Sequence, residues 1–225
     1  MIWLKYKKIL ISRHLIKNIL LINLRIYGKM ACLSPKNLIK IMRVKRRDSI
    51  KLNIGCGKVK LPGWVNIDIE PGADLVLDVR HKLPFDDNSV DYIFNEHFFE
   101  HLSFEEGLKT LRDFHRCLKV GGVLRIAMPN LDDLIQKYNT DWKKQDWLYQ
   151  PEYEFIETRG MMINIALRWW GHKYSYNEED LRRHMVKAGF REVIKCEKAR
   201  SEHAELCGLE TTRLDPELIL EAVKY

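Results

Sequence analysis

The chain has 225 residues, 46% of them hydrophobic, a length that favours one globular domain with appendages over two full domains. Its five cysteines are widely spaced and never form a C-x-x-C pair, which argues against a disulfide framework or a cysteine zinc site and favours a reducing cytoplasm. Residues 1–47 hold 13 of the 38 Lys and Arg residues and none of the 31 Asp and Glu residues. The remaining body is mildly acidic, so a nucleic-acid partner is not expected.

Residues 1–47 read as a basic N-terminal extension in which leucine and isoleucine alternate with charges. The uncharged run Asn18–Leu24 is far shorter than the roughly 20 residues that cross a bilayer, and no signal-peptide pattern is present. Three interpretations stay open: a helical extension packed loosely on the body, peripheral contact with the anionic inner face of a membrane, or a translation start at Met30 or Met42. A cytoplasmic location is expected in each case.

From residue 48 onward, short apolar runs alternate with longer periodic segments, a pattern typical of an α/β domain with a mostly parallel sheet. The spacing of Phe104, Leu108, Leu111 and Phe114 predicts a helix on one face. In chain order we expect strands at Ile50–Ile54, Val65–Ile69, Ala73–Val79 and Val90–Asn95, a helix over Phe104–Leu118 and a fifth strand at Val123–Met128.

Residues 131–176 differ from the rest of this domain because they are rich in tryptophan and tyrosine and poor in β-branched runs. We expect an insertion of helices and loops that acts as a lid, whose aromatic side chains form either its own core or a platform for a substrate. After it the pattern predicts a helix over Glu178–Ala188, stopped by Gly189, and strands at Arg191–Lys198 and Glu217–Val223.

The sequence LNIGCGK at 52–58 places Gly55 and Gly57 directly after the first strand, where a turn without side chains lets the backbone approach a ligand. A phosphate loop would need Gly at position 52 and Ser or Thr at position 59, but Leu52 and Val59 stand there. The phosphate-loop interpretation therefore fails.

A dinucleotide-binding turn would need a third glycine at position 60, where Lys60 stands, and a helix that receives a pyrophosphate. Only residues 58–64 separate the turn from the second strand, and Pro62 and Gly63 lie among them. A full helix is not expected there, which disfavours a nucleotide-binding oxidoreductase without removing it as an alternative.

Two acidic residues follow the next strands. Asp68 ends the second strand, where a carboxylate can accept hydrogen bonds from both hydroxyls of a ribose, and Asp78 ends the third, where it can accept from an adenine amine. Each alone could equally be a turn or cap residue. Their joint placement beside the glycine turn favours a nucleoside site at this edge of the sheet.

The segments NIGCGK, VNIDIE, DLVLDVRHKLPFDDNSVDYIFNEHFFEHL and HRCLKVGGVLRIAMPN resemble the class I S-adenosylmethionine-dependent methyltransferases, particularly a small bacterial, type 11-like branch. The resemblance spans about residues 51–129, with a weaker similarity in GHKYSYNEEDLRRHMVKAGF. It implies a Rossmann-like sandwich in residues 48–225, with a mostly parallel seven-stranded sheet, an antiparallel last strand and helices on both faces. It also implies S-adenosyl-L-methionine as cofactor and a small-molecule, sugar or lipid-linked methyl acceptor.

The resemblance also implies which residues bind this cofactor. Asn53 stands where an acidic residue is usual, so it keeps a hydrogen bond to the cofactor's ammonium group but gives up the charge attraction. The implied cofactor residues are Asn53, Gly55, Cys56, Gly57, Asn95 and Glu96 on the methionine side, Asp68 at the ribose, and Ile69, Asp78 and Val79 at the adenine.

For the chemistry, His172 in the lid is the candidate general base and His101 a second candidate that could instead shape the cofactor pocket. His97 and His101 have the i, i+4 spacing of metal ligands, but the sequence suggests no third ligand and lacks H-E-x-x-H, so no metal is expected. A binding module with this fold but no catalysis remains the other alternative.

Overall fold

The computed structural model describes residues 34–212 and 217–225. The first 33 residues, with the expected membrane contact and Met30, lie outside the described residues. Within the described ranges, no helix is long and apolar enough to cross a membrane. The strands are β1 (Lys51–Ile54), β2 (Val65–Asp68), β3 (Leu75–Val76), β4 (Val90–Glu96), β5 (Leu118–Pro129), β6 (Glu192–Lys195) and β7 (Glu217–Val223).

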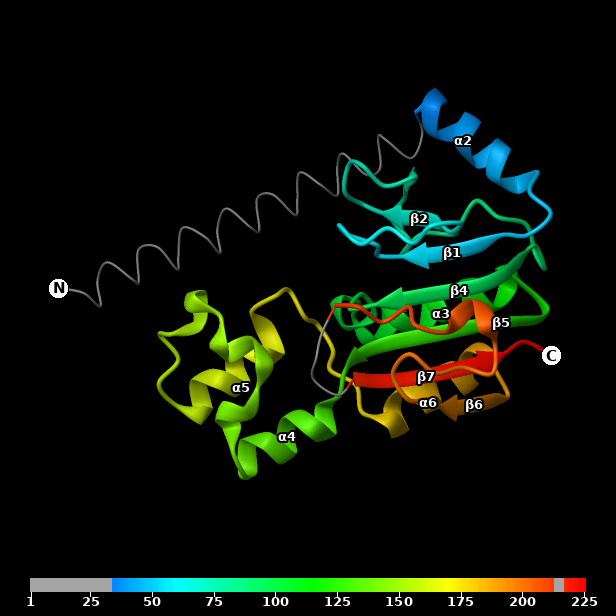
Figure 1. The fold of residues 1–225 in the computed structure, drawn as a ribbon. Coiled ribbons are helices and arrows are strands. Elements are labelled where there is room, and N and C mark those ends of the chain that lie inside the picture. Colours follow the sequence, from blue (N-terminus) through cyan, green and yellow to red (C-terminus); the bar gives the residue numbers. More distant parts are fainter. Residues whose placement is uncertain (1–33, 213–216) are drawn as a thin grey trace.

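These strands form one sheet in the order β3-β2-β1-β4-β5-β7-β6 (Figure 1). The pairs from β3 to β5 are parallel, and β7 runs antiparallel to both of its neighbours. The mostly parallel sheet with an antiparallel last strand is therefore confirmed. Four strands are shorter than predicted: β1 and β2 each lack one terminal residue, β3 keeps only two residues, and β6 ends at Lys195.

The register of the central strands brings their carboxyl ends to one edge. Ile54 lies opposite both Ile67 and Asn95, and Asp68 lies opposite Val76. The residues that follow these strands are therefore neighbours in space, which is where ligands bind in open α/β sheets. As predicted, no helix forms between β1 and β2.

Helices α3 (Phe104–Cys117) and α6 (Glu178–Ala188) cover one face of the sheet, and the segment that contains the short helix η5 (Ala204–Leu206) lies on the other (Figure 1). Side chains alternate between the faces: Ile93 joins the cluster that includes α3 and α6, and its neighbour Phe94 joins the cluster with Leu206.

Arg125 on β5 is fully buried on the second face of the sheet, where it holds the segment that contains η5 in place. Its guanidinium pairs with Glu210 at 2.5 Å and with Glu221 on β7. It also donates a hydrogen bond to the carbonyl oxygen of Arg200 at 3.0 Å. Two carboxylates and a backbone carbonyl thus compensate a buried charge and tie the segment before β7 to the sheet.

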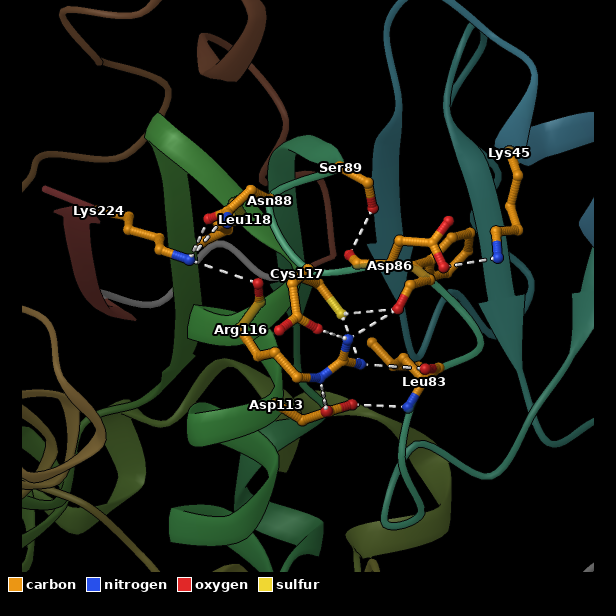
Figure 2. Close-up of polar contacts among 12 residues, drawn as sticks. Lys45, Leu83, Asp86, Asn88, Ser89, Asp113, Arg116, Cys117, Leu118 and Lys224 are labelled. Carbon is orange, nitrogen blue, oxygen red and sulfur yellow. Dashed lines mark hydrogen bonds and ion pairs between the residues drawn. The ribbon is translucent and has the colours of Figure 1, made fainter.

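Arg116, near the end of α3, fixes the connection from β3 to β4 (Figure 2). Its guanidinium donates to the carbonyl oxygens of Phe85 at 2.8 Å and Leu83 at 3.1 Å, and pairs with Asp113 at 2.8 Å. Asp113 in turn accepts from the backbone N–H of Leu83 at 2.6 Å. One planar cation therefore satisfies several backbone groups of a loop that has no secondary structure of its own.

Helix α2 (Pro35–Lys45) lies within the expected extension yet packs against β3. Ile41 and Val44 are buried in the main core. Asn37 donates to the carbonyl oxygen of Val76 at 3.2 Å and accepts from its backbone N–H at 3.3 Å. Residues 35–45 of the predicted extension are thus part of the packed domain.

The insertion at 131–176 projects beyond the carboxyl edge of the sheet (Figure 1). It leaves and rejoins the domain at one place, because the backbone N–H of Leu131 donates to the carbonyl oxygen of Tyr176 at 3.0 Å. It has a separate hydrophobic cluster with Trp147 and Tyr153 at its centre. Its helices are α4 (Leu131–Asn139), η2 (Trp142–Lys144), η3 (Asp146–Tyr149), η4 (Pro151–Tyr153) and α5 (Arg159–Arg168).

Candidate active site

Three adjoining cavities lie at the carboxyl edge of the sheet. The strand-end cavity, of about 400 Å³, borders the residues after β1, β2 and β3. The turn cavity, of about 310 Å³, lies beside the glycine turn. The lid cavity, of about 270 Å³, lies between the end of β5 and the lid.

The glycine turn has the backbone conformation that its sequence predicts. Gly55 and Gly57 have φ of +68° and +48°, in the left-handed region that favours glycine. A Cβ atom at Gly55 would lie 2.6 Å from the ring of Phe98, so a side chain there has no room. Both glycines line the strand-end and turn cavities.

Asp68, the last residue of β2, and Asp78, which follows β3, also line the strand-end cavity. Asp68 accepts from the backbone N–H groups of Gly57 at 2.8 Å and Glu70 at 2.9 Å, which fixes its carboxylate at the rim. Asp78 pairs with Arg80 through two nitrogens. Burial alone raises the pKa of Asp78, but its hydrogen bonds to Arg80 and the charge of Arg80 outweigh this and leave the pKa below its ordinary value.

The structure brings most of the predicted cofactor residues together. The strand-end cavity has apolar walls that suit a flat aromatic base, with carboxylates at its edge. Of the predicted residues it is lined by Gly55, Gly57, Asp68, Ile69, Asp78 and Val79, and the turn cavity is lined by Asn53, Gly55, Cys56, Gly57 and Glu96. These side chains fit an adenosyl group with an amino-acid tail.

Asn53 is buried beside the turn cavity. Its amide nitrogen donates to Asn66 at 3.0 Å and to the carbonyl oxygen of Val59 at 3.2 Å. The amide oxygen is then the atom left to accept a hydrogen bond from an ammonium group, the role that the resemblance implies for Asn53. The thiol of Cys56 stays protonated, because burial and the charge of Asp68 raise its pKa to about 11.

Asn95 does not lie where the resemblance placed it. It is fully buried, lines none of the three cavities, and its amide atoms have no hydrogen-bond partner among the described residues. The alternation along β4 explains this correction, because Asn95 points to the opposite face from Glu96. Glu96 does reach the turn cavity, and its carboxylate accepts from the backbone and hydroxyl of Thr212 at 2.9 and 2.6 Å.

His101 and His172 meet across the wall between the strand-end cavity and the lid cavity. Their rings lie edge to face with centroids 5.0 Å apart. His101, on the short helix η1 (Phe99–His101), lines both cavities, and His172 lines the lid cavity. The backbone N–H of Lys173 donates to the carbonyl oxygen of Glu100 at 2.9 Å and so holds the irregular C-terminal segment of the lid against η1.

Burial and neighbouring charges shift the pKa values of His172 and His97 in opposite directions. Burial lowers the pKa of His172 to about 4, so its imidazole is neutral at pH 7. Burial alone also lowers the pKa of His97, but hydrogen bonds to Glu100 and Glu217 and their charges raise it to about 9. A group with a pKa near 4 is a weak proton acceptor at neutral pH, so the geometry supports the place of His172 better than its predicted role as a base.

Sequence reasoning assigned no role to Trp170 and Thr212, and it left Glu100 as one of several candidate bases near the end of the fourth strand. All three residues line these cavities. Glu100 is 2% exposed and faces His97 at 3.2 Å. A glutamate buried beside three histidines has no local sequence signal, because His172 lies far along the chain. Trp170 donates to the hydroxyl of Tyr153 at 2.7 Å, which holds its ring at the cavity wall.

Comparisons with known proteins agree with this geometry. Residues 52–126, about a third of the chain, match the family model described as "Methyltransferase domain". A search of the curated proteins found no match.

Among solved structures, a SAM-dependent methyltransferase from Archaeoglobus fulgidus is similar with 16% identity and a TM-score of 0.51, over 84% of this chain and 94% of that one. A "possible histamine N-methyltransferase" from Thermotoga maritima is 16% identical over 84% of this chain and 89% of that one, with a TM-score of 0.45. The first similarity shows the fold.

Proposed function

We propose that this chain, which matches a methyltransferase-domain model over residues 52–126, is a class I S-adenosylmethionine-dependent methyltransferase and that it methylates a small molecule bound in the lid cavity. One observation carries the proposal: His97, His101 and Trp170 line both the strand-end cavity and the lid cavity. The two cavities therefore meet, and a methyl donor in the first adjoins an acceptor in the second. About 270 Å³ suits a small acceptor, or one sugar or head group of a larger lipid-linked molecule.

When bound, the cofactor would supply a sulfonium methyl group, so that a new bond from the methyl carbon to an acceptor oxygen or nitrogen replaces the C–S bond and the electrons of the C–S bond stay on sulfur. Gly55 and Gly57 would give the cofactor room along the backbone, and Asp68 would accept hydrogen bonds from its ribose. The lid excludes water from the acceptor and orients it, which supplies much of the rate. The acceptor must also lose a proton, and His101 and His172 line the cavity that would hold it.

The proposal predicts that filling the lid cavity stops turnover without affecting the cofactor. Ala166 on α5 lines the lid cavity, and Met161 on the same helix is exposed. We expect Ala166→Phe to bind S-adenosylhomocysteine like the wild type by isothermal titration but to lose at least ten-fold in transfer of labelled methyl groups to a small-molecule extract.

Met161→Phe adds the same ring outside the cavity and should retain both properties. Full turnover of Ala166→Phe, or label recovered in protein or nucleic acid instead of small molecules, would contradict the proposal. Failure of the wild type to bind S-adenosylhomocysteine would contradict the cofactor assignment itself.

A further inference from the structure

The wall between the strand-end and lid cavities holds a cluster of metal-ligating side chains. Glu100, His101 and His172 each offer one ligand atom, and these atoms all lie within 4.8 Å of one another. All three residues line the lid cavity. We propose that they bind a divalent transition-metal cation, a site that the sequence did not predict because its third ligand comes from the lid.

Glu100 is the first argument for a cation. It is 2% exposed, and its Oε2 atom has no hydrogen-bond partner among the described residues. Its Oε1 atom lies 3.9 Å from Nε2 of His172. A buried carboxylate oxygen without a partner is unfavourable, and a bound cation would compensate it.

The orientation of His172 is the second argument. Its Nδ1 atom lies 2.9 Å from the carbonyl oxygen of Ala166. A carbonyl oxygen only accepts, so Nδ1 carries the hydrogen and Nε2 presents its lone pair toward Glu100. Metal-binding histidines commonly donate their other ring N–H to a carbonyl in this way, which fixes both tautomer and ring orientation.

The ligand set selects the kind of cation. Two imidazoles and one carboxylate suit Zn²⁺ and neighbouring transition metals, whereas Mg²⁺ and Ca²⁺ prefer oxygen ligands. Zinc bonds are about 2 Å long, so two ligands of one ion lie at most about 4 Å apart, and an adjustment of about 1 Å closes the cluster. Three protein ligands leave a coordination position open to the cavity.

A second group, Glu96, His97 and Glu217, has similar spacing but carries no such proposal. Both oxygens of Glu96 accept from Thr212. His97 lies between two carboxylates, 3.2 Å from Glu100 and 2.6 Å from Glu217. Oε2 of Glu217, like Oε2 of Glu100, has no hydrogen-bond partner among the described residues. Both ring nitrogens of His97 face carboxylate oxygens, however, so neither offers a lone pair to a metal, and His97 instead holds Glu100 in place.

The role of the cation rests on the proposed function. An acceptor hydroxyl bound at the open position would lose its proton more readily, because a divalent cation lowers the pKa of a coordinated oxygen. His101 and His172 would then act as ligands instead of bases. Metal binding is measured without any acceptor, so failure of this inference and failure of the proposed function are distinguishable.

The test is titration of the chelator-treated full chain with Zn²⁺ by calorimetry and with Co²⁺ by absorption spectroscopy. We expect one ion per chain, a cobalt spectrum of a nitrogen and oxygen site without a thiolate charge-transfer band, displacement of cobalt by zinc, and no comparable binding of Mg²⁺. His172→Phe and His101→Phe each keep an aromatic ring at the site and should weaken Zn²⁺ affinity at least ten-fold.

His203→Phe is the matched control, because His203 lines none of the three cavities and should bind Zn²⁺ like the wild type. Circular dichroism and urea denaturation establish that each variant is folded, and either of the two site variants suffices for the comparison. The inference is overturned by absence of stoichiometric binding, by unchanged affinity in a folded site variant, or by a thiolate cobalt spectrum, which would indicate adventitious cysteine binding.

Discussion

At the scale of single residues, Gly55 separates two effects that a glycine can have. Its φ of +68° penalises any side chain by about 1 kcal/mol, and a Cβ atom would in addition meet Phe98 at 2.6 Å. Gly208 has nearly the same φ, +72°, but no atom within 4 Å of a Cβ and no place in the three cavities. A side chain at either glycine would therefore have the same unfavourable backbone conformation, but only at Gly55 would it also clash with a neighbouring residue.

We predict that Gly55→Ala weakens S-adenosylhomocysteine binding at least ten-fold and destabilises the protein by more than Gly208→Ala does. Gly208→Ala should cost about 1 kcal/mol and leave the affinity unchanged. Isothermal titration and urea denaturation measure the two quantities. Wild-type affinity in Gly55→Ala would show that the turn does not touch the cofactor.

At the scale of elements, the loop between β3 and β4 depends on one side chain of α3. Arg116 donates to the carbonyl oxygens of Leu83 and Phe85 and pairs with Asp113 (Figure 2). Lysine keeps the charge but cannot reproduce the planar fork of donors. Leaving partly buried backbone carbonyls without donors costs about 1–3 kcal/mol.

Arg116→Lys should therefore lower the free energy of unfolding by about 2 kcal/mol in urea. Arg112→Lys makes the same substitution one turn earlier on the exposed face of α3 and should stay within about 0.5 kcal/mol of the wild type. Equal effects of the two substitutions would mean that the loop gains nothing from the arginine fork.

Features that depend on residues close together in the sequence could be predicted, whereas contacts between distant segments could not. The glycine turn and the acids after β2 and β3 were predictable because strand ends and turn residues are encoded locally and parallel strands end at one edge. The burial of Asn95 also has a local cause, because side chains along β4 alternate between the two faces of the sheet. The resemblance assigned Asn95 to the cofactor without taking this alternation into account. The meeting of Glu100 with His172 could not be predicted, because the lid's path back to η1 depends on packing between distant segments.

At the scale of the whole molecule, the lid and the sheet have separate cores. The main cluster runs through the sheet with α3 and α6, whereas the lid's cluster contains only a few buried side chains around Trp147. Helix α4 has no buried residue at all. A unit with few buried apolar contacts opens at a lower free energy than the core it is attached to.

Native-state hydrogen exchange should therefore resolve two units. We predict that amides of α5 exchange through an opening of lower free energy and weaker urea dependence than amides of β4 and β5 in the same sample. Trp147→Ala removes a buried ring that contacts Tyr153 and Trp170, so it should speed exchange in α5 and leave β4 and β5 unchanged. A single opening free energy shared by the α5 and β-strand amides, or equal acceleration of both by this substitution, would show instead that lid and sheet unfold as one body, and the lid could not then admit its acceptor by opening alone.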